Sequence, residues 1–268
     1  MATLLPLPTG VTGVGAGAEA CGVALSGSDV YVAGNVPTST ASTAACWMNG
    51  ALTTLPTPSG MAGSNADAIA VSGSDVYVAG DASAYGINYS PVYWVNGTAT
   101  VLPMPSGIDA AAVTAIAVSG SNIYMAGYGY TGAGEEYAIY WANGTTTILS
   151  LPGNLTQSEA SSIAISGSDV YVAGSVSNSA GEAIPTYWVN GTATMLSLPG
   201  NSTEAVAESI VVSGSNVYVS GAVQYGAGEP IGDGQVVAAY WVNGAATALP
   251  LPSGATDSYN TGIAVTTQ

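Results

Sequence analysis

The sequence predicts an all-β protein, a β-propeller of four-stranded antiparallel blades. Two phrases that recur in step along the 268 residues lead to this prediction. The phrase SGS begins at positions 26, 72, 119, 166 and 213, at spacings of 46, 47, 47 and 47 residues. The phrase WxNG begins at positions 47, 94, 141, 188 and 241, at spacings of 47, 47, 47 and 53 residues. Five complete repeats of about 47 residues result, which is a typical length for a propeller blade.

Each repeat reads as four short strands, and the second copy shows the first two clearly. The apolar run at 68–71 is followed by the tight turn SGSD. The run at 76–79 reads VYVA, and β-branched and aromatic residues favour a pleated sheet. We expect Gly80 to end this second strand. No segment has a persuasive helical period.

The second half of each repeat is a further hairpin. In the second copy the third strand lies at 91–95 and the fourth at 98–102, with Asn96 and Gly97 between them. Asn-Gly is the strongest short hairpin signal, because a type I′ turn needs positive φ at both central residues. Prolines follow the fourth strand and supply no backbone N–H, so this strand belongs at the sheet edge.

The aromatic residues of the repeat are predicted to lie between blades. One blade cannot bury both of its faces alone, so each copy must offer the same face to the next. Because every Trp precedes a hairpin at the same register, packing is favoured over sugar stacking as its role. These residues are Tyr31, Tyr77, Tyr124, Tyr171 and Tyr218, with Trp47, Trp94, Trp141, Trp188 and Trp241.

The pairing of VYVAG with YWxNG resembles a group of poorly characterised prokaryotic propeller-repeat proteins with a kelch-like layout. The resemblance covers nearly the whole chain. It departs at the residue after Trp, where Lys is common in the group and this chain has Met, Val or Ala. The resemblance implies the propeller fold and a surface-exposed setting, and it brings no catalytic residues.

We expect a single propeller domain over residues 1–268. The fifth repeat is the longest, because extra residues lie around 226–235. The repeats run roughly over residues 20–60, 66–107, 113–153, 160–200 and 207–254.

The two ends of the chain add strands to the five repeats. Residues 2–8 match a fourth strand and residues 261–267 match a first strand, so the propeller has five or six blades. The extra strands could join blade edges, close the ring, or pair with a neighbouring molecule by strand addition. The apolar residues of these assembly strands are Leu4, Leu5, Leu7, Ile263 and Val265.

The charge of the chain excludes several functions. It has 16 carboxylates and no Lys, Arg or His, which gives a net charge of −16. Nucleic-acid binding needs basic residues to neutralise phosphates, and an anionic membrane surface would repel this chain. No His metal ligand and no Lys or Arg salt bridge can form.

The composition suggests an extracellular location. The opening MATLLPLPTG has no basic segment and no uninterrupted apolar run, so we expect no signal peptide there. Below about pH 3 most carboxyl groups would be protonated and the chain nearly neutral, which fits an acidic setting. We therefore predict an extracellular or cell-surface protein, with a biased surface composition as the alternative to an acidic habitat.

Carboxylates in the variable loops are the candidate metal ligands. Glycine-rich loops contain Glu135, Glu136, Glu229 and Asp233, whose oxygens suit Ca²⁺. The spacing matches no calcium motif, so solvated loops are favoured and no cofactor is expected. Asp67 and Glu208 lie five residues before their SGS phrases, where a channel mouth could bind a ligand.

Covalent modifications are the last group of candidate sites. Cys21 and Cys46 could form a disulfide or remain free thiols. The pattern Asn-x-Ser/Thr marks glycosylation at Asn88, Asn154 and Asn201, outside the hairpin turns.

No acid–base pair stands out in the sequence, so we expect a protein without enzymatic activity. The favoured function is an extracellular structural or adhesive protein that assembles with itself, as an oligomer or filament, by sharing terminal strands. The alternative is a lectin-like propeller, because five similar blades could offer similar pockets to glycans.

Overall fold

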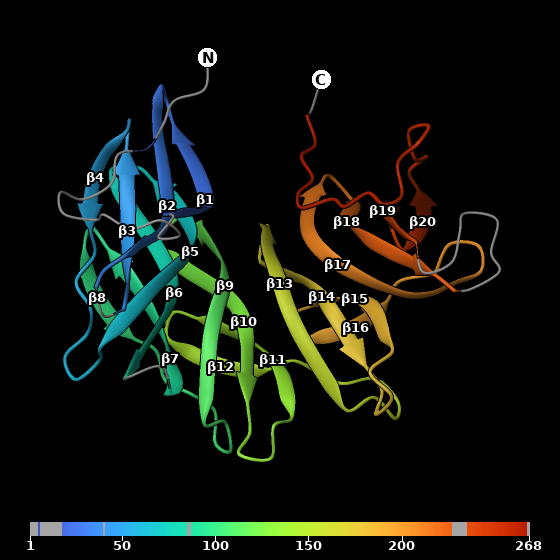
Figure 1. The fold of residues 1–268 in the computed structure, drawn as a ribbon, viewed down its shortest axis with the longest axis horizontal. Helices are drawn as coiled ribbons and strands as arrows, with labels where there is room; N and C mark the ends of the chain where they lie inside the picture. The colour runs from blue at the N-terminus through green and yellow to red at the C-terminus, as the bar shows by residue number, and fades with distance from the viewer. Residues whose placement is uncertain (1–4, 6–17, 40, 85–86, 227–234, 267–268) are drawn as a thin grey trace. The chain divides into compact units, whose positions relative to one another are not determined.

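The computed structural model describes residues 5, 18–39, 41–84, 87–226 and 235–266, and these residues form five antiparallel sheets of four strands each. In every sheet the strands follow one another in chain order, as a meander (Figure 1). The described part of the chain contains no helix. The predicted all-β propeller fold is therefore confirmed, and we call the sheets blades 1 to 5.

The strands of the first two blades are as follows. Blade 1 comprises β1 (Glu19–Ser26), β2 (Asp29–Pro37), β3 (Ser42–Met48) and β4 (Ala51–Thr54). Blade 2 comprises β5 (Gly63–Ser72), β6 (Asp75–Ala84), β7 (Ile87–Val95) and β8 (Thr98–Val101).

The remaining blades repeat this layout. Blade 3 comprises β9 (Ala110–Ser119), β10 (Asn122–Tyr130), β11 (Glu136–Ala142) and β12 (Thr145–Ile148). Blade 4 comprises β13 (Gln157–Ser166), β14 (Asp169–Ser177), β15 (Ala183–Val189) and β16 (Thr192–Met195). Blade 5 comprises β17 (Ser202–Ser213), β18 (Asn216–Tyr225), β19 (Val236–Val242) and β20 (Ala245–Ala248).

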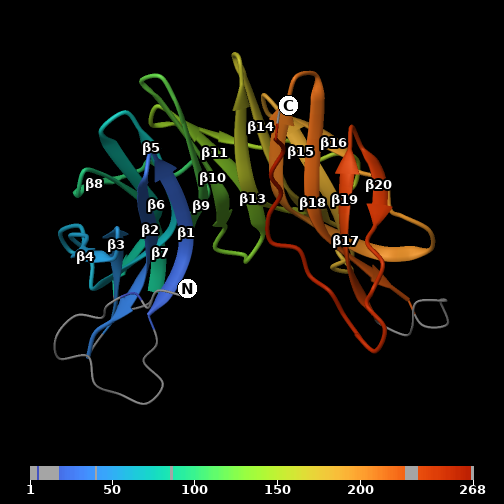
Figure 2. The same ribbon diagram turned by 90° about the horizontal axis from the view of Figure 1, so that it is seen from above.

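The chain divides into two compact units. Unit 1 is Met1–Ala133 with Trp141–Thr146, and unit 2 is Gly134–Tyr140 with Thr147–Gln268. The first strands of successive blades lie beside one another within each unit, β1 by β5 and β5 by β9 in unit 1, and β13 by β17 in unit 2. Figure 2 shows the same blades from above.

The predicted Asn-Gly hairpins are present in all five blades. Asn96 has a φ of 50° and Gly97 a φ of 81°. In the other four pairs the asparagine has a φ of 49–50° and the glycine a φ of 81–86°. The Asn96 side chain also accepts a hydrogen bond from the Val76 backbone N–H at 2.9 Å and donates to Asp75 at 2.8 Å. The turn between the third and fourth strands is thus tied to the start of the second strand.

The prediction that the tryptophans pack between blades is confirmed for four of the five, whereas Trp47 packs against residues of its own blade and Leu5. All five Trp side chains are at most 1% exposed. The indole N–H of each of four of them donates to a carbonyl oxygen in the segment that leaves the preceding blade. These pairs are Trp94 to Pro56, Trp141 to Pro103 and Trp188 to Ser150 at 2.9 Å, and Trp241 to Ser197 at 2.7 Å.

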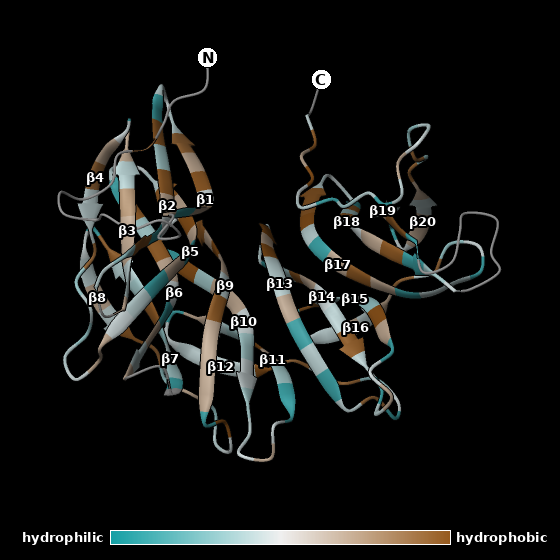
Figure 3. Ribbon diagram, in the orientation of Figure 1, coloured by the Kyte–Doolittle hydropathy of each residue, from teal (hydrophilic) through white to brown (hydrophobic). Residues whose placement is uncertain are grey.

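Apolar residues alternate with polar ones along the strands that line these interfaces. Figure 3 shows this alternation of hydropathy on β13 and β17. The core between blades 4 and 5, for example, contains Leu196, Val219 and Trp241, each at most 4% exposed.

Two sequence-based expectations about strand ends are wrong. The second strand of blade 2 does not end at Gly80 but runs on to Ala84. The predicted terminal strand at 261–267 is not a strand over residues 261–266. A first strand needs the second strand of its own blade as a hydrogen-bonding partner, and residues 261–266 pair with no strand in the described part of the chain.

Residues of both terminal segments nevertheless contact the blades at the positions that the repeat predicts. The Ser258 backbone N–H donates to the Val236 carbonyl at 2.9 Å, and the Ser258 hydroxyl accepts from the Ala238 N–H at 2.9 Å. Ser158 makes the same contact with Ala138 at 2.9 Å. Leu5 packs against the cluster that contains Trp47, whereas Leu4 and Leu7 lie outside the described residues.

Candidate functional site

A β-bulge interrupts the first strand of every blade at the same place. The pairing of the first and second strands skips one residue, and this residue lies five positions before the SGS phrase. Bulges re-aim a side chain and are common next to functional sites. The bulged residue differs in every blade: it is Cys21, Asp67, Thr114, Ser161 or Glu208.

The bulge explains the glycine of the VYVAG phrase. A Cβ added to Gly80 would collide with the carbonyl oxygen of Asn65, two residues before the bulged Asp67. Gly34, Gly127, Gly174 and Gly221 meet the equivalent carbonyl oxygen in their own blades. The glycine therefore permits a close approach of two backbones, and it does not end the strand.

Three carboxyl groups interact at the bulges of unit 1. Asp67 is half-buried on β5, and Asp81, on β6, is 7% exposed. The pKa of Asp67 is raised from its ordinary value of 3.8 to about 7, mainly by burial and further by the charges of Asp81 and Glu19. No basic side chain exists in the sequence to offset this repulsion. We call Glu19, Asp67 and Asp81 the unit 1 carboxyl cluster.

One amide side chain contacts the unit 1 carboxyl cluster, and a second forms hydrogen bonds next to the bulges at Cys21 and Asp67. The Asn65 side-chain amide lies 3.4 Å from both carboxylate oxygens of Asp81. Burial raises the pKa of Asp81, and the hydrogen bond from Asn65 partly opposes this rise. Asn35 accepts a hydrogen bond from the Ala66 N–H at 2.7 Å and donates to the Cys21 sulfur at 3.6 Å. The two aspartates thus have different environments.

The bulged cysteine of unit 1 is not an activated nucleophile. Burial, with the charges of Asp67 and Glu19, raises the pKa of Cys21 from 9.0 to about 11. The thiol therefore keeps its proton at neutral pH. No disulfide joins Cys21 on β1 to Cys46 on β3.

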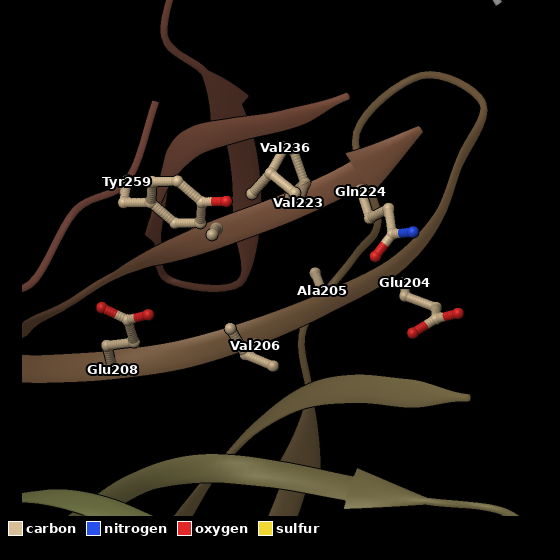
Figure 4. A pocket seen from close by; sticks show the side chains of 9 residues that line it. Glu204, Ala205, Val206, Glu208, Val223, Gln224, Val236 and Tyr259 are labelled. Carbon is tan, nitrogen blue, oxygen red and sulfur yellow. The ribbon is translucent and has the colours of Figure 1, made fainter. Parts of the chain in front are cut away.

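A pocket in unit 2 contains the bulged residue of blade 5. The pocket has a volume of about 130 Å³ and is lined by side chains of β17, β18 and the start of β19, with Tyr259 from the C-terminal segment. Glu204, Glu208 and Gln224 provide its polar groups, and Val206 and Val236 line it with apolar surface. Figure 4 shows the Glu208 carboxyl group directed to the side of β17 on which the Tyr259 ring lies.

Two of the side chains that line this pocket are exposed to solvent. Tyr259 is 67% exposed and Val206 is 37% exposed. Burial raises the pKa of Glu208 above its ordinary value. The pocket therefore combines an accessible aromatic ring, two carboxyl groups and one amide, all within unit 2.

The sequence anticipated part of this arrangement. Asp67 and Glu208 were noted as residues near which a channel mouth could bind a ligand, with solvation as the favoured reading, and both occupy bulges. Because the second strand was expected to end at Gly80, Asp81 would follow it in the loop, but it lies within β6 and is buried. Glu19 and Tyr259 were missed. The signal for Glu19 was its place seven residues before an SGS phrase, where blade 4 has Glu159.

The remaining candidate residues have separate positions. Glu135 precedes β11 and Glu136 begins it, while Glu229 and Asp233 lie outside the described residues. Among the described residues no three His, Cys, Asp or Glu side chains are placed to hold a metal ion. Asn88, Asn154 and Asn201 are exposed, and their glycosylation stays a prediction. No helix of the described chain is long and apolar enough to cross a bilayer.

Comparisons with known proteins give no family for this chain. No protein-family model matches it, and no curated protein does. Among solved structures, an arabinanase of Bacillus subtilis has 12% identity and a TM-score of 0.41 over 78% of this chain and 91% of its own. An α-L-arabinofuranosidase of Clostridium thermocellum has 14% identity and a TM-score of 0.42 over 87% and 94% of the chains. An exo-1,5-α-L-arabinanase from a bovine ruminal metagenomic library has 10% identity and a TM-score of 0.44 over 87% and 99%.

These comparisons correct two sequence-based expectations. We expected a structural or adhesive protein that assembles through its terminal strands, and we expected no enzymatic activity. The similar structures are instead enzymes named for their action on carbohydrates, so both expectations are contradicted. Because the identities are low, any functional argument has to come from the residues of this chain.

Proposed function

We propose that this protein binds neutral carbohydrates in the unit 2 pocket. The observation that supports the proposal is the 67% exposed ring of Tyr259 in a pocket of about 130 Å³ that Glu204 and Glu208 also line. Concave sites with apolar walls and a few convergent polar groups are typical binding sites for small ligands.

The chemistry of the pocket matches a sugar ring. A sugar presents apolar C–H faces, which pack on an aromatic ring, and hydroxyl groups, which donate hydrogen bonds. Hydroxyl-to-carboxylate hydrogen bonds are short and stronger than neutral ones. Gln224 can both donate and accept. Because the chain has a net charge of −16, sulfated or acidic sugars would be repelled.

A glycan array followed by titration calorimetry tests this proposal. We expect the full chain to bind neutral oligosaccharides and not acidic ones. Tyr259→Ala and Glu208→Gln should each weaken binding by about tenfold or more, which corresponds to about 1.4 kcal/mol. Tyr89→Ala is the matched control, because Tyr89 is an exposed tyrosine of unit 1. Failure to bind any neutral glycan, or undiminished affinity in Tyr259→Ala, would overturn the proposal.

A second candidate function is hydrolysis of a glycosidic bond by Asp67 and Asp81. The observation that favours it is the unequal environment of the two carboxyl groups, since pairs of this kind divide into an acid and a base. With a pKa of about 7, Asp67 holds a proton for much of the time at neutral pH and can donate it to the leaving oxygen. In its carboxylate form Asp81, hydrogen-bonded by Asn65, can accept a proton from the attacking water.

Release of reducing ends from neutral polysaccharides, including arabinan and fructan, tests this second function. Asp67→Asn and Asp81→Asn should each abolish release, and the rate in the unaltered protein should fall as the pH rises through about 7. Asp75→Asn is the control, because Asn122 and Asn216 occupy the same position in blades 3 and 5. Absence of hydrolysis, or full activity in Asp67→Asn, would exclude this function.

A further inference from the structure

The residue before the core tryptophan differs in blade 1 from that in the other four blades. It is a tyrosine in blades 2 to 5 and a cysteine in blade 1. The positions are otherwise in strict register along the repeat, with Cys46 paired to Thr53 as Tyr187 is paired to Thr194. The four tyrosines are Tyr93, Tyr140, Tyr187 and Tyr240.

The interface between blades 4 and 5 shows what the tyrosine does. Tyr187 packs against a buried cluster that includes Val219 and Trp241 of blade 5. It is half-buried, so one part of its side chain lies among apolar groups and another part reaches solvent. The phenol ring therefore fills space between the two blades.

The interface between blades 1 and 2 is built from the same residues without that ring. Cys46 packs against a cluster that includes Val78 and Trp94, the counterparts of Val219 and Trp241. Tyr31 and Leu55 of this interface likewise correspond to Tyr171 and Leu196.

A cavity is present in this interface. Its volume is about 200 Å³, and its lining includes Tyr31, Cys46, Leu55, Val78 and Trp94, with the exposed Met48 at the rim. Of all its lining residues, only Cys46 and Met48 differ from their counterparts at the interface of blades 4 and 5. The cavity therefore coincides with the place of the missing phenol ring.

We propose that this cavity is a binding site for a small uncharged aromatic molecule of the size of a phenol. Apolar cavities of about 150 Å³ bind benzene, so about 200 Å³ can hold one substituted ring. The ring would pack on Val78 and Leu55 and against the Trp94 indole. A hydroxyl substituent would stay hydrated at the open side, as the half-buried tyrosines of the other blades do. The net charge of −16 disfavours an aromatic carboxylate.

Calorimetry with p-cresol, the side chain of tyrosine, tests the site directly in the full chain. We expect saturable binding at one site, with benzoate and cyclohexanol binding more weakly. Cys46→Tyr fills the cavity and should weaken binding by about tenfold or more. Cys46→Ala keeps the cavity and should retain binding. Equal p-cresol affinity in Cys46→Tyr and the unaltered protein, or no binding to the unaltered protein, would overturn the proposal.

The reciprocal substitution gives an independent test at the matched interface. Tyr187→Cys recreates the cavity between blades 4 and 5, so the stoichiometry of p-cresol should rise from one to two. A stoichiometry that stays at one while the variant is folded would count against a cavity defined by the missing ring.

A third measurement needs no substitution at all. Saturating p-cresol should slow alkylation of the Cys46 thiol severalfold, while the exposed Cys21 serves as an internal control in the same sample. Unchanged alkylation of Cys46 would overturn the proposal, even if Cys46→Tyr failed to fold.

Discussion

The indole N–H of Trp94 donates a hydrogen bond to the carbonyl oxygen of Pro56, 2.9 Å away. Trp94 lies on the third strand of blade 2, and Pro56 lies in the segment that leaves blade 1. The same contact recurs at Trp141, Trp188 and Trp241. In each case one buried ring forms a hydrogen bond with the segment that leaves the preceding blade.

Replacing Trp94 by phenylalanine should lower the free energy of unfolding by about 2 to 3 kcal/mol. The change removes the donor to Pro56, leaves its carbonyl without that partner, and opens a small void in a site that is 0% exposed. Urea unfolding measures the loss. Tyr89→Phe, at an exposed site, should change stability by less than about 0.5 kcal/mol. A loss for Trp94→Phe as small as that of the control would contradict this role.

Replacing Gly80 by alanine should destabilise the protein by about 3 kcal/mol or more. The new Cβ would collide with the Asn65 carbonyl oxygen, so the two strands would have to separate at the bulge. Thermal unfolding measures the effect. Gly262→Ala is the matched control, because an added Cβ there meets nothing within 4 Å. Comparable melting temperatures for the two variants would show that the close approach is unimportant.

The hairpin residue Asn96 should respond in two steps. Asn96→Gly keeps the positive φ but loses the hydrogen bonds with Val76 and Asp75, which should cost about 1 kcal/mol. Asn96→Ala also forces an alanine into a φ of about 50°, which should cost about 1 to 2 kcal/mol more. Denaturant titration should give a lower free energy of unfolding for Asn96→Ala than for Asn96→Gly. The reverse order would contradict the prediction.

The stability of the protein should fall as the pH rises from 4 to 8. The pKa of Asp67 is about 7 in the folded chain and 3.8 in its ordinary state, so the folded state binds this proton more tightly. Its contribution is fully present below about pH 4 and is lost as the pH rises through 7. The raised pKa values of Asp81, Glu159 and Glu208 act in the same direction.

Melting temperatures measured across this pH range test the prediction. Asp67→Asn should flatten the dependence between pH 4 and 7, because the amide does not ionise. Asp75→Asn should leave the slope unchanged, since Asn122 and Asn216 already serve at that position. A stability maximum near neutral pH in the unaltered protein would contradict the prediction.

Local patterns in the sequence were sufficient to predict the blades. Strand composition, the Asn-Gly turns and the register of the tryptophans all act over a few residues, and each was confirmed. The strand end predicted at Gly80 is wrong, because an isolated glycine in a strand marks either an end or a close backbone contact. Only the approach of the Asn65 carbonyl decides between these two meanings, and that approach depends on the bulge at Asp67.

The candidate sites were less accessible to sequence analysis, because they depend on contacts between distant segments. Tyr259 reaches the pocket through the hydrogen bonds of its neighbours Asp257 and Ser258 with Val236. No short sequence motif predicts such a contact. The cavity beside Cys46, by contrast, follows from one break in a strict repeat, which alignment of the copies reveals once the interface is known.

The direction of the tryptophan contacts has a consequence for synthesis on the ribosome. Trp94, Trp141, Trp188 and Trp241 all bond backward, to a segment made 38 or 44 residues earlier. A newly emerged blade therefore always meets an acceptor that has already left the exit tunnel. Blades can dock in the order in which they are translated, because the tryptophan of each new blade meets an acceptor that has already been made.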